Sequence, residues 1–374
     1  MSKTSNINTD FGYVNVLLNN DTDDFLVAEY NATQRQPILT NMQDFQMGVV
    51  RLKIPTSAIP LMVFEDDAYT IGFSLGNTDT NLLTQVVTHD LPANTSQQYP
   101  YNRFIFYYNQ LLTDVNNALA NLWAQALIDP AYAAVLATYT QNETPRFRLV
   151  KDQAYIELLV PINPTGTSFY PANPLGINIS MSKKLFYFFS GFSAQINTIG
   201  GWGGDPRLSY KLQIGNYLNG DTIESVFAYP PIDPAMEFNV ISQDYPSLFL
   251  WQTLTRIIIT TSIPIEQEVI VTRDNQGKTN RQAVLTDFEI SQTQVGLREY
   301  IYFFPQGDLR WSNFKGTGWL DRFDMKVWFQ TKDLTIYPIQ IPPTFEFSIK
   351  IEFKRRKAKE LLQYTKDTSE IQYF

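Results

Sequence analysis

Residues 345–354, near the end of the sequence, alternate without interruption between apolar and polar side chains. This alternation has a period of two, which is the period of a β-strand with one buried and one solvated face. The apolar side chains, which we expect to be buried together, are Phe345, Phe347, Ile349, Ile351 and Phe353. The polar side chains, expected on the opposite face, are Glu346, Ser348, Lys350, Glu352 and Lys354. A closing strand of this kind requires a sheet that it can join.

Short strand-like segments run through most of the remaining sequence, separated by turns rich in Pro, Gly, Asn and Asp. This pattern is typical of a β-sandwich or a barrel. A parallel α/β sheet would need a helix after each strand, and the sequence shows no such succession of helical patterns. We therefore predict a mainly β protein. Within residues 45–54 the alternation changes phase between Val49 and Val50, which predicts a β-bulge.

One long segment, residues 103–128, has a helical pattern instead. Its apolar residues recur at intervals of three and four, which places them along one stripe of an amphipathic helix. Asp129-Pro130 follows directly and is expected to end the element. We predict a single main helix near 103–128, inserted into the β structure.

The glycine-rich segment GGWGGDP, residues 200–206, is the best candidate for a domain boundary. A chain of 374 residues is long enough for two domains. We predict a first β-sandwich over residues 11–200, which contains the helix, and a second over residues 205–357. A disordered arm, residues 1–10, and a C-terminal tail, residues 358–374, would flank them.

The sequence offers little for catalysis or metal binding. It has no Cys and one His, His89, so a zinc site is improbable and any histidine-dependent chemistry would have to use that residue. His89 follows a strand-like run, and we expect it to be exposed or to cap the strand end. No phosphate-binding loop or nucleophile-elbow motif occurs. We predict no enzyme, no cofactor and no metal, although a glycosidase-like pair of carboxylates stays open.

The composition favours assembly. Charged residues make up 18% of the chain, below the usual quarter, while aromatic residues make up 14%. A chain so poor in charge is expected to cover much of its surface with partners. Because the chain has no Cys, no disulfide can join the subunits, so apolar contacts must hold them together. The net charge of −8 argues against nucleic-acid binding by the overall field. No apolar run reaches the length of a membrane span.

Several phrases of the sequence together resemble known proteins. They include QDYPSLFLWQTLTRIIITTSIPI (243–265), YIYFFPQGDLRWSNFKG (300–316) and LTIYPIQIPPTFEFSIKIEFKRRK (334–357). In order and content they are similar to jelly-roll structural proteins of small eukaryotic DNA viruses and virus-like elements. The resemblance implies either one jelly-roll sandwich or two in one chain, and a subunit of an icosahedral capsid. The implied partners are copies of the chain and other capsid proteins. The implied location is the virion, assembled in the host cytoplasm or nucleus. The resemblance does not separate a major capsid protein from a minor, penton-type one.

The closing strand runs directly into a basic block. We predict a genome-facing basic patch that neutralises phosphates of packaged nucleic acid. Its candidate residues are Lys350, Lys354, Arg355, Arg356, Lys357 and Lys359. A solvated, frayed strand end, balanced by acidic residues of the tail, would explain the same residues.

A different function class fits the β-rich composition as well. A carbohydrate- or receptor-binding β-sandwich, such as a fibre or spike module, would use exposed aromatic loops. Trp202, within GGWGGDP, is the candidate for such a loop. Formation of particles by the purified protein favours the capsid hypothesis, whereas ligand binding by a soluble monomer favours the binding module.

Overall fold

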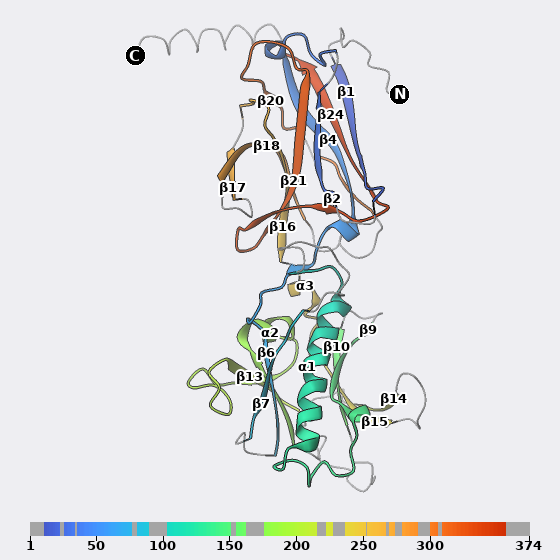
Figure 1. The fold of residues 1–374 in the computed structure, drawn as a ribbon, viewed down its shortest axis with the longest axis vertical. Helices are drawn as coiled ribbons and strands as arrows, with labels where there is room; N and C mark the ends of the chain where they lie inside the picture. Colours follow the sequence, from blue (N-terminus) through green and yellow to red (C-terminus); the bar gives the residue numbers. More distant parts are fainter. Residues whose placement is uncertain are drawn as a thin grey trace. The chain divides into compact units, whose positions relative to one another are not determined.

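The chain forms two compact units in the computed structural model (Figure 1). Unit 1 consists of residues 1–60 and 254–374, and unit 2 consists of residues 61–253. The structure describes residues 11–22, 26–33, 36–76, 81–89, 103–150, 155–161, 176–214, 222–226, 236–251, 253–266, 269–273, 279–290, 300–305 and 309–356. The predicted arm and C-terminal tail lie outside the described residues.

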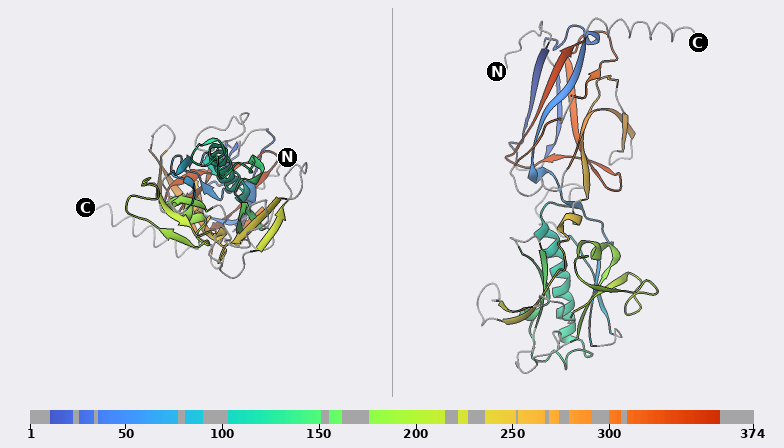
Figure 2. Two further views of the ribbon diagram at one scale, coloured as in Figure 1. Left: turned by 90° about the horizontal axis from the view of Figure 1, so that it is seen from below. Right: turned by 180° about the vertical axis from the view of Figure 1, so that it is seen from behind.

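Unit 1 is a sandwich of two antiparallel sheets. Sheet A has the order β1-β24-β4-β19, and its strands are β1 (Phe11–Asn19), β24 (Glu346–Arg355), β4 (Phe45–Pro55) and β19 (Tyr300–Phe303), with β20 (Ser312–Asn313) also pairing with β4. Sheet B has the order β17-β18-β16-β21-β22, and its strands are β17 (Val269–Arg273), β18 (Thr279–Glu289), β16 (Leu254–Thr261), β21 (Arg322–Thr331) and β22 (Ile336–Pro338), with β3 (Glu29–Thr33) also pairing with β21. A short ladder joins β2 (Leu26–Val27) and β23 (Gln340–Ile341). Figure 2 shows β1, β24 and β4 side by side.

The strand order of unit 1 is that of a jelly roll. The eight principal strands, in chain order, are β1, β3, β4, β16, β18, β19, β21 and β24. In sheet A the first strand pairs with the eighth, the eighth with the third, and the third with the sixth. In sheet B the second pairs with the seventh, the seventh with the fourth, and the fourth with the fifth. This is the wrapping order of two Greek keys in a double-sheet roll. The predicted jelly-roll fold class is therefore confirmed.

Unit 2 is an insertion between the third and fourth of these strands. It begins after β4 and ends before β16, so the jelly roll is interrupted in sequence and continuous in space. The backbone N–H of Thr253 donates to the carbonyl oxygen of Leu61 at 3.0 Å, which places the two ends of the insertion side by side.

This arrangement corrects the predicted division into residues 11–200 and 205–357. The alternation of a strand identifies its buried face but carries no information about its partner. Here β1 pairs with β24 along its whole length, from Phe11↔Lys354 to Asn19↔Glu346. The first strand therefore belongs with the last one, and the chain divides into nested units instead of consecutive ones. The segment GGWGGDP lies within unit 2.

The closing strand agrees with the alternation. Phe347, Ile349, Ile351 and Phe353 are all at most 1% exposed, and they pack between the sheets of unit 1. Phe345 precedes the strand and is half-buried, so it only partly fulfils the prediction. On the opposite face, Ser348 and Glu352 are also buried. The reason is that β24 lies between β1 and β4, and side chains of these two strands cover the outer face of β24.

The predicted bulge in β4 is confirmed. Lys350 of β24 pairs with Arg51, but the next residue, Ile351, pairs with Val49. Val50 is therefore the extra residue on β4. The bulge lets β4 keep apolar side chains in the core on both sides of the phase change.

Unit 2 is a second two-sheet sandwich. One sheet has the order β14-β15-β10-β9, and its strands are β14 (Thr222–Val226), β15 (Met236–Ser242), β10 (Tyr155–Pro161) and β9 (Arg146–Val150). The other has the order β12-β13-β11-β6-β7, and its strands are β12 (Ala194–Ile196), β13 (Leu208–Leu212), β11 (Ile177–Ser182), β6 (Thr70–Leu75) and β7 (Leu83–Val86). Smaller elements are β5 (Met62–Val63) paired with β8 (Phe104–Ile105), and the helices α2 (Lys183–Phe188) and α3 (Leu248–Trp251).

The predicted helix is α1 (Tyr108–Ile128), and it fills one side of this sandwich (Figure 1). It contacts β7 and β9, which are edge strands of the two sheets, so it links them. The helix begins five residues later than predicted because Phe104 and Ile105 form β8. Gln110 accepts the backbone N–H groups of Phe106 and Tyr107 at the helix start. The predicted end at Asp129 is confirmed.

The closing strand gives a test of register. Phe347→Ala should lower the free energy of unfolding of unit 1 by about 3–5 kcal/mol, the range for a core aromatic replaced by a cavity. Glu346→Ala on the opposite face should cost no more than about 1 kcal/mol, since its ion pair with Lys53 lies at the surface. Urea denaturation of the two variants measures both values. Equal costs at the two positions would show that the register of β24 is wrong.

Candidate functional site

The predicted basic patch is only partly assembled by the fold. Lys350 and Lys354 both lie on the outer face of sheet A, where they are half-buried. The Lys350 ammonium lies 4.3 Å from the ring centre of Tyr13, and the Lys354 ammonium lies 5.3 Å from that of Trp311. Both lysines therefore rest on aromatic rings of neighbouring segments, an arrangement that stabilises a cation.

The remaining predicted residues behave differently. Arg355 is exposed, and its guanidinium lies 4.0 Å from the carboxylate of Asp44. Arg356 is 8% exposed, and its backbone N–H donates to the carbonyl of Asp44 at 2.7 Å. Arg356 therefore does not join an exposed patch. Lys357 and Lys359 lie outside the described residues.

Two cations that the sequence prediction missed come from β4. Lys53 forms an ion pair with Glu346 of β24, and its ammonium lies 4.0 Å from the ring centre of Tyr300. The hydrogen bond to Glu346 raises the pKa of Lys53, so this side chain is cationic at neutral pH. Arg51 lies directly opposite Lys350 in the register. These residues are some 300 positions from β24 in sequence, so only knowledge of the pairing could have identified them.

These residues form a surface that we call the lysine–aromatic face. It consists of Lys53, Lys350 and Lys354 with the rings of Tyr300, Tyr13 and Trp311. Arg51 adds a fourth cation, and Glu346 and Glu352 are the acidic residues of the same stretch of β24. The face thus has a surplus of positive charge on a chain whose net charge is −8. Such a surface suits an anionic partner.

Exposed apolar side chains lie at both edges of sheet A. On β1, Tyr13 and Leu17 project outwards and are more than half exposed. At the other edge, Tyr302 and Phe304 are also exposed, and their rings stack with centres 6.4 Å apart. Large apolar side chains in solvent at sheet edges are typical of protein–protein contact surfaces.

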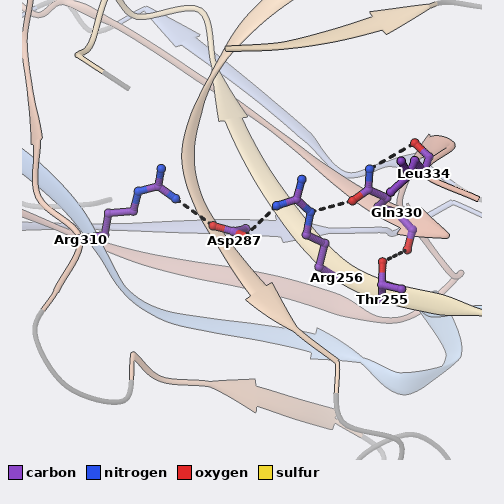
Figure 3. A network of polar contacts seen from close by, with 6 residues as sticks. All are labelled: Thr255, Arg256, Asp287, Arg310, Gln330 and Leu334. Atoms are coloured by element: carbon purple, nitrogen blue, oxygen red, sulfur yellow. Dashed lines mark hydrogen bonds and ion pairs between the residues drawn. The ribbon is translucent and has the colours of Figure 1, made fainter. Parts of the chain in front are cut away.

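A polar network crosses sheet B (Figure 3). Asp287 of β18 accepts from Arg310 at 2.9 Å and from Arg256 of β16 at 3.1 Å. The Nε atom of Arg256 donates to the side-chain oxygen of Gln330 on β21 at 2.7 Å. Gln330 in turn donates to the backbone carbonyl of Leu334 at 3.2 Å. The network therefore links three strands of sheet B to the turn that follows β21.

The segment GGWGGDP is an ordered loop between β12 and β13. Trp202 donates its backbone N–H to Leu208 at 2.9 Å, and Asp205 donates its own to Trp202 at 3.0 Å. The carboxylate of Asp205 pairs with Arg207, and this hydrogen bond lowers the pKa of Asp205. The Lys211 ammonium lies 3.9 Å from the centre of the Trp202 ring, so one face of the indole is already occupied.

The side chain of His89 is buried, which corrects the expectation of an exposed or capping residue. Its side chain is 5% exposed, and its Nδ1 atom lies 2.7 Å from a carboxylate oxygen of Asp114. The reason is packing, since the segment that carries His89 lies between α1, which provides Asp114, and the ring of Phe64 at 5.6 Å. Among the described residues, no group of three or more His, Cys, Asp and Glu could hold a metal ion. No helix in the same part of the chain is long and apolar enough to cross a membrane.

Comparison with known proteins identifies the family to which this chain belongs. The family model for the Sputnik minor capsid protein V18/19 matches residues 68–355, well over half of the chain. The chain belongs to the Sputnik minor capsid protein V18/19 family. As a member of this family, it is a structural capsid protein of a virion, and the predicted resemblance to viral capsid proteins is confirmed.

Solved structures give the same fold along nearly the whole chain. A chain of the Sputnik virophage, solved by cryo-electron microscopy at 3.5 Å resolution, aligns with a TM-score of 0.67 and 23% identity, covering 93% of this chain and 98% of its own. The mavirus penton protein, from a selenomethionine crystal structure, aligns with a TM-score of 0.59 and 16% identity, covering 92% and 99% respectively. Among curated proteins, none matches the sequence significantly. The two similar structures support the jelly-roll fold of this member of the V18/19 family.

The loop at Trp202 gives a matched pair of tests. Gly200 and Gly201 both have positive φ, of 80° and 72°, so alanine at either position costs about 1–2 kcal/mol in backbone strain. A Cβ at Gly201 would lie 1.8 Å from the carbonyl oxygen of Asp205, whereas one at Gly200 meets nothing within 4 Å. Gly201→Ala should therefore open the loop to proteolysis, and Gly200→Ala should leave it protected. Equal rates of cleavage in the two variants would contradict this loop geometry.

Proposed function

We propose that the protein is the penton-type subunit of an icosahedral capsid, with five copies closing into a ring at a vertex. The observation that carries the proposal is the likeness to the mavirus penton protein over 92% of this chain and 99% of that one. A likeness of this extent covers both units, including the insertion between β4 and β16. Membership of a minor capsid protein family fits a subunit used at few positions of the shell.

The surface of unit 1 supports this assembly. Exposed apolar side chains lie on β1 and beside β19, at opposite edges of sheet A. A ring of identical subunits uses two different surfaces of each chain, one for each neighbour. Two separated apolar surfaces on one unit meet that requirement. Contacts above roughly 1,000 Å² with apolar cores would make such a ring specific.

Within the capsid, the role that we propose is structural and not enzymatic. The partners are copies of the chain and the other capsid proteins that surround a vertex. Assembly would take place in the cytoplasm or the nucleus of the host cell. Family membership supports the structural role, since the family consists of capsid proteins.

The oligomeric state tests the proposal. Native mass spectrometry or light scattering at micromolar concentration should give a particle of about five times the chain mass of 43.0 kDa. Apolar contacts should make the ring persist at high salt, where surface ion pairs are screened. A protein that stays monomeric at every concentration and salt tested would refute the penton role.

We further propose that the lysine–aromatic face contacts phosphates of the packaged genome. The observation that favours this function is the surplus of cations on that face, with Lys350 and Lys354 as its members from the predicted patch. Rings beneath the ammonium groups hold them in place and offer surfaces for base stacking. A local basic face is compatible with the acidic chain, because solvent ions screen more distant charges.

Charge reversal tests this second function. The double variant Lys350→Glu/Lys354→Glu should weaken binding to single- or double-stranded DNA, and the slope of log K against log salt should fall by about 2. A matched control is Lys183→Glu/Lys184→Glu, which makes the same change in net charge at α2 of unit 2. Binding by the control should equal that of the wild type. If both double variants lose the same affinity, only the overall charge matters and the face has no specific role.

A further inference from the structure

The hairpin that joins β21 to β22 contains a residue in an unusual conformation. Its loop is Lys332, Asp333 and Leu334, closed by hydrogen bonds from the N–H of Leu334 to the carbonyl of Thr331 at 2.9 Å and from the N–H of Thr331 to Thr335 at 3.0 Å. Leu334, the last residue of the loop, has φ of 68°. In three-residue hairpin loops this left-handed position normally carries Gly. A bulky side chain there is strained.

The strain at Leu334 is not offset by burial of its side chain within the chain. The side chain is 72% exposed, more than any other large apolar side chain that the structure describes in unit 1. Two other described residues besides glycine have positive φ, Asp67 and Thr344, and both have polar side chains. Leu334 is thus the described residue that combines a left-handed backbone with an exposed apolar side chain.

Bonds within the turn hold this conformation. Asp333 accepts from the backbone N–H of Thr335 at 3.3 Å and from the hydroxyl of Thr335 at 2.9 Å. The hydroxyl of Thr331 donates to the carbonyl of Thr335 at 3.1 Å. Burial acts to raise the pKa of Asp333, but its hydrogen bonds with Thr331 and Thr335 together outweigh burial and lower the pKa, so the carboxylate is ionised at neutral pH.

A second set of bonds ties the same turn to sheet B. The carbonyl of Leu334 accepts from Gln330, which is held by Arg256, which pairs with Asp287 (Figure 3). Arg310 completes the network from the segment before β20. Strained backbone persists only where its surroundings determine it, and such sites are concentrated at functional contacts. The network therefore holds the backbone at Leu334, whose side chain is exposed to solvent.

We propose that Leu334 is an apolar anchor that inserts into a second copy of this chain within the capsid ring. The inference rests on the proposed penton role and adds a contact residue to it. A ring interface is formed by two different surfaces, so a projecting anchor on one copy needs an apolar receiving surface elsewhere on the next. Unit 1 offers such surfaces at both edges of sheet A, with Leu17 at one and the stacked Tyr302 and Phe304 at the other.

The charges of the turn favour a protein partner over nucleic acid. Lys332 and Asp333 stand next to the anchor with opposite charges, so the turn brings no net charge to the contact. A preorganised anchor also loses little conformational freedom when it is buried, which increases affinity for a given contact area. The leucine side chain at position 334 therefore has two effects. It strains the backbone of the free chain, and it increases the affinity between copies in the ring.

This inference gives an experiment in which stability and assembly change in opposite directions. Leu334→Asn and Leu334→Gly put residues that accept a left-handed backbone into the turn and remove the apolar side chain. The midpoint of urea unfolding, measured at concentrations where all variants are monomeric, should be no lower than that of the wild type. The apparent dissociation constant of the ring should rise by about tenfold or more, because burial of a leucine side chain at each contact is lost. Leu334→Met keeps an apolar side chain and should assemble like the wild type.

The outcomes separate this inference from the penton role. If the wild type forms the ring and both Leu334→Asn and Leu334→Gly form it equally well, the anchor is refuted and the penton role stands. If these variants form the ring normally but fail to join other capsid proteins, the anchor's partner is a different subunit and the assignment to a second copy is refuted. If the wild type forms no ring, both proposals fail.

Discussion

The jelly roll depends on the pairing of its first strand with its last. β1 and β24 match residue for residue along nine positions, and β24 passes on to β4 at its other edge. Without this ladder, the core side chains Phe347, Ile349 and Phe353 would lose one wall of the sandwich. The same ladder brings Tyr13 beneath Lys350 on the outer face. One non-local pairing therefore supports the core on one side of sheet A and the lysine–aromatic face on the other.

The pairing also explains what could be predicted from the sequence and what could not. Alternation identified β24 and the bulge at Val50, and helical spacing identified α1, because each of these patterns reports on burial within a single element. The nesting of unit 2 was missed, since the partners of β1 and β24 are hundreds of positions apart and strand patterns do not encode partners. For the same reason, Lys53 was absent from the predicted patch although it lies next to Glu346. Arg356 was included in the predicted patch because a run of basic residues in the sequence does not show that one of their side chains is buried.

The two contact surfaces that we propose for unit 1 differ in how they are held. On the outer face of sheet A, aromatic rings support the cations, so charge is displayed without strain. In sheet B, a network of charged and amide groups holds a strained turn. Both devices fix side chains before a partner arrives. A capsid subunit gains from such order, because its contacts must form in the same geometry in every copy of the shell.

The insertion of unit 2 has a consequence for synthesis on the ribosome. β1 and β4 are made early, but β24, which lies between them in sheet A, is made about 300 residues later. At about 5–20 residues per second, this delay is on the order of 15–60 seconds. The strands that the structure describes in unit 2 pair with one another, so unit 2 can fold during that interval. Meanwhile the edges of β1 and β4 that later receive β24 are still unpaired. The nascent chain thus has a period in which unit 2 is complete and the strands of unit 1 are still exposed to misassociation with neighbouring chains.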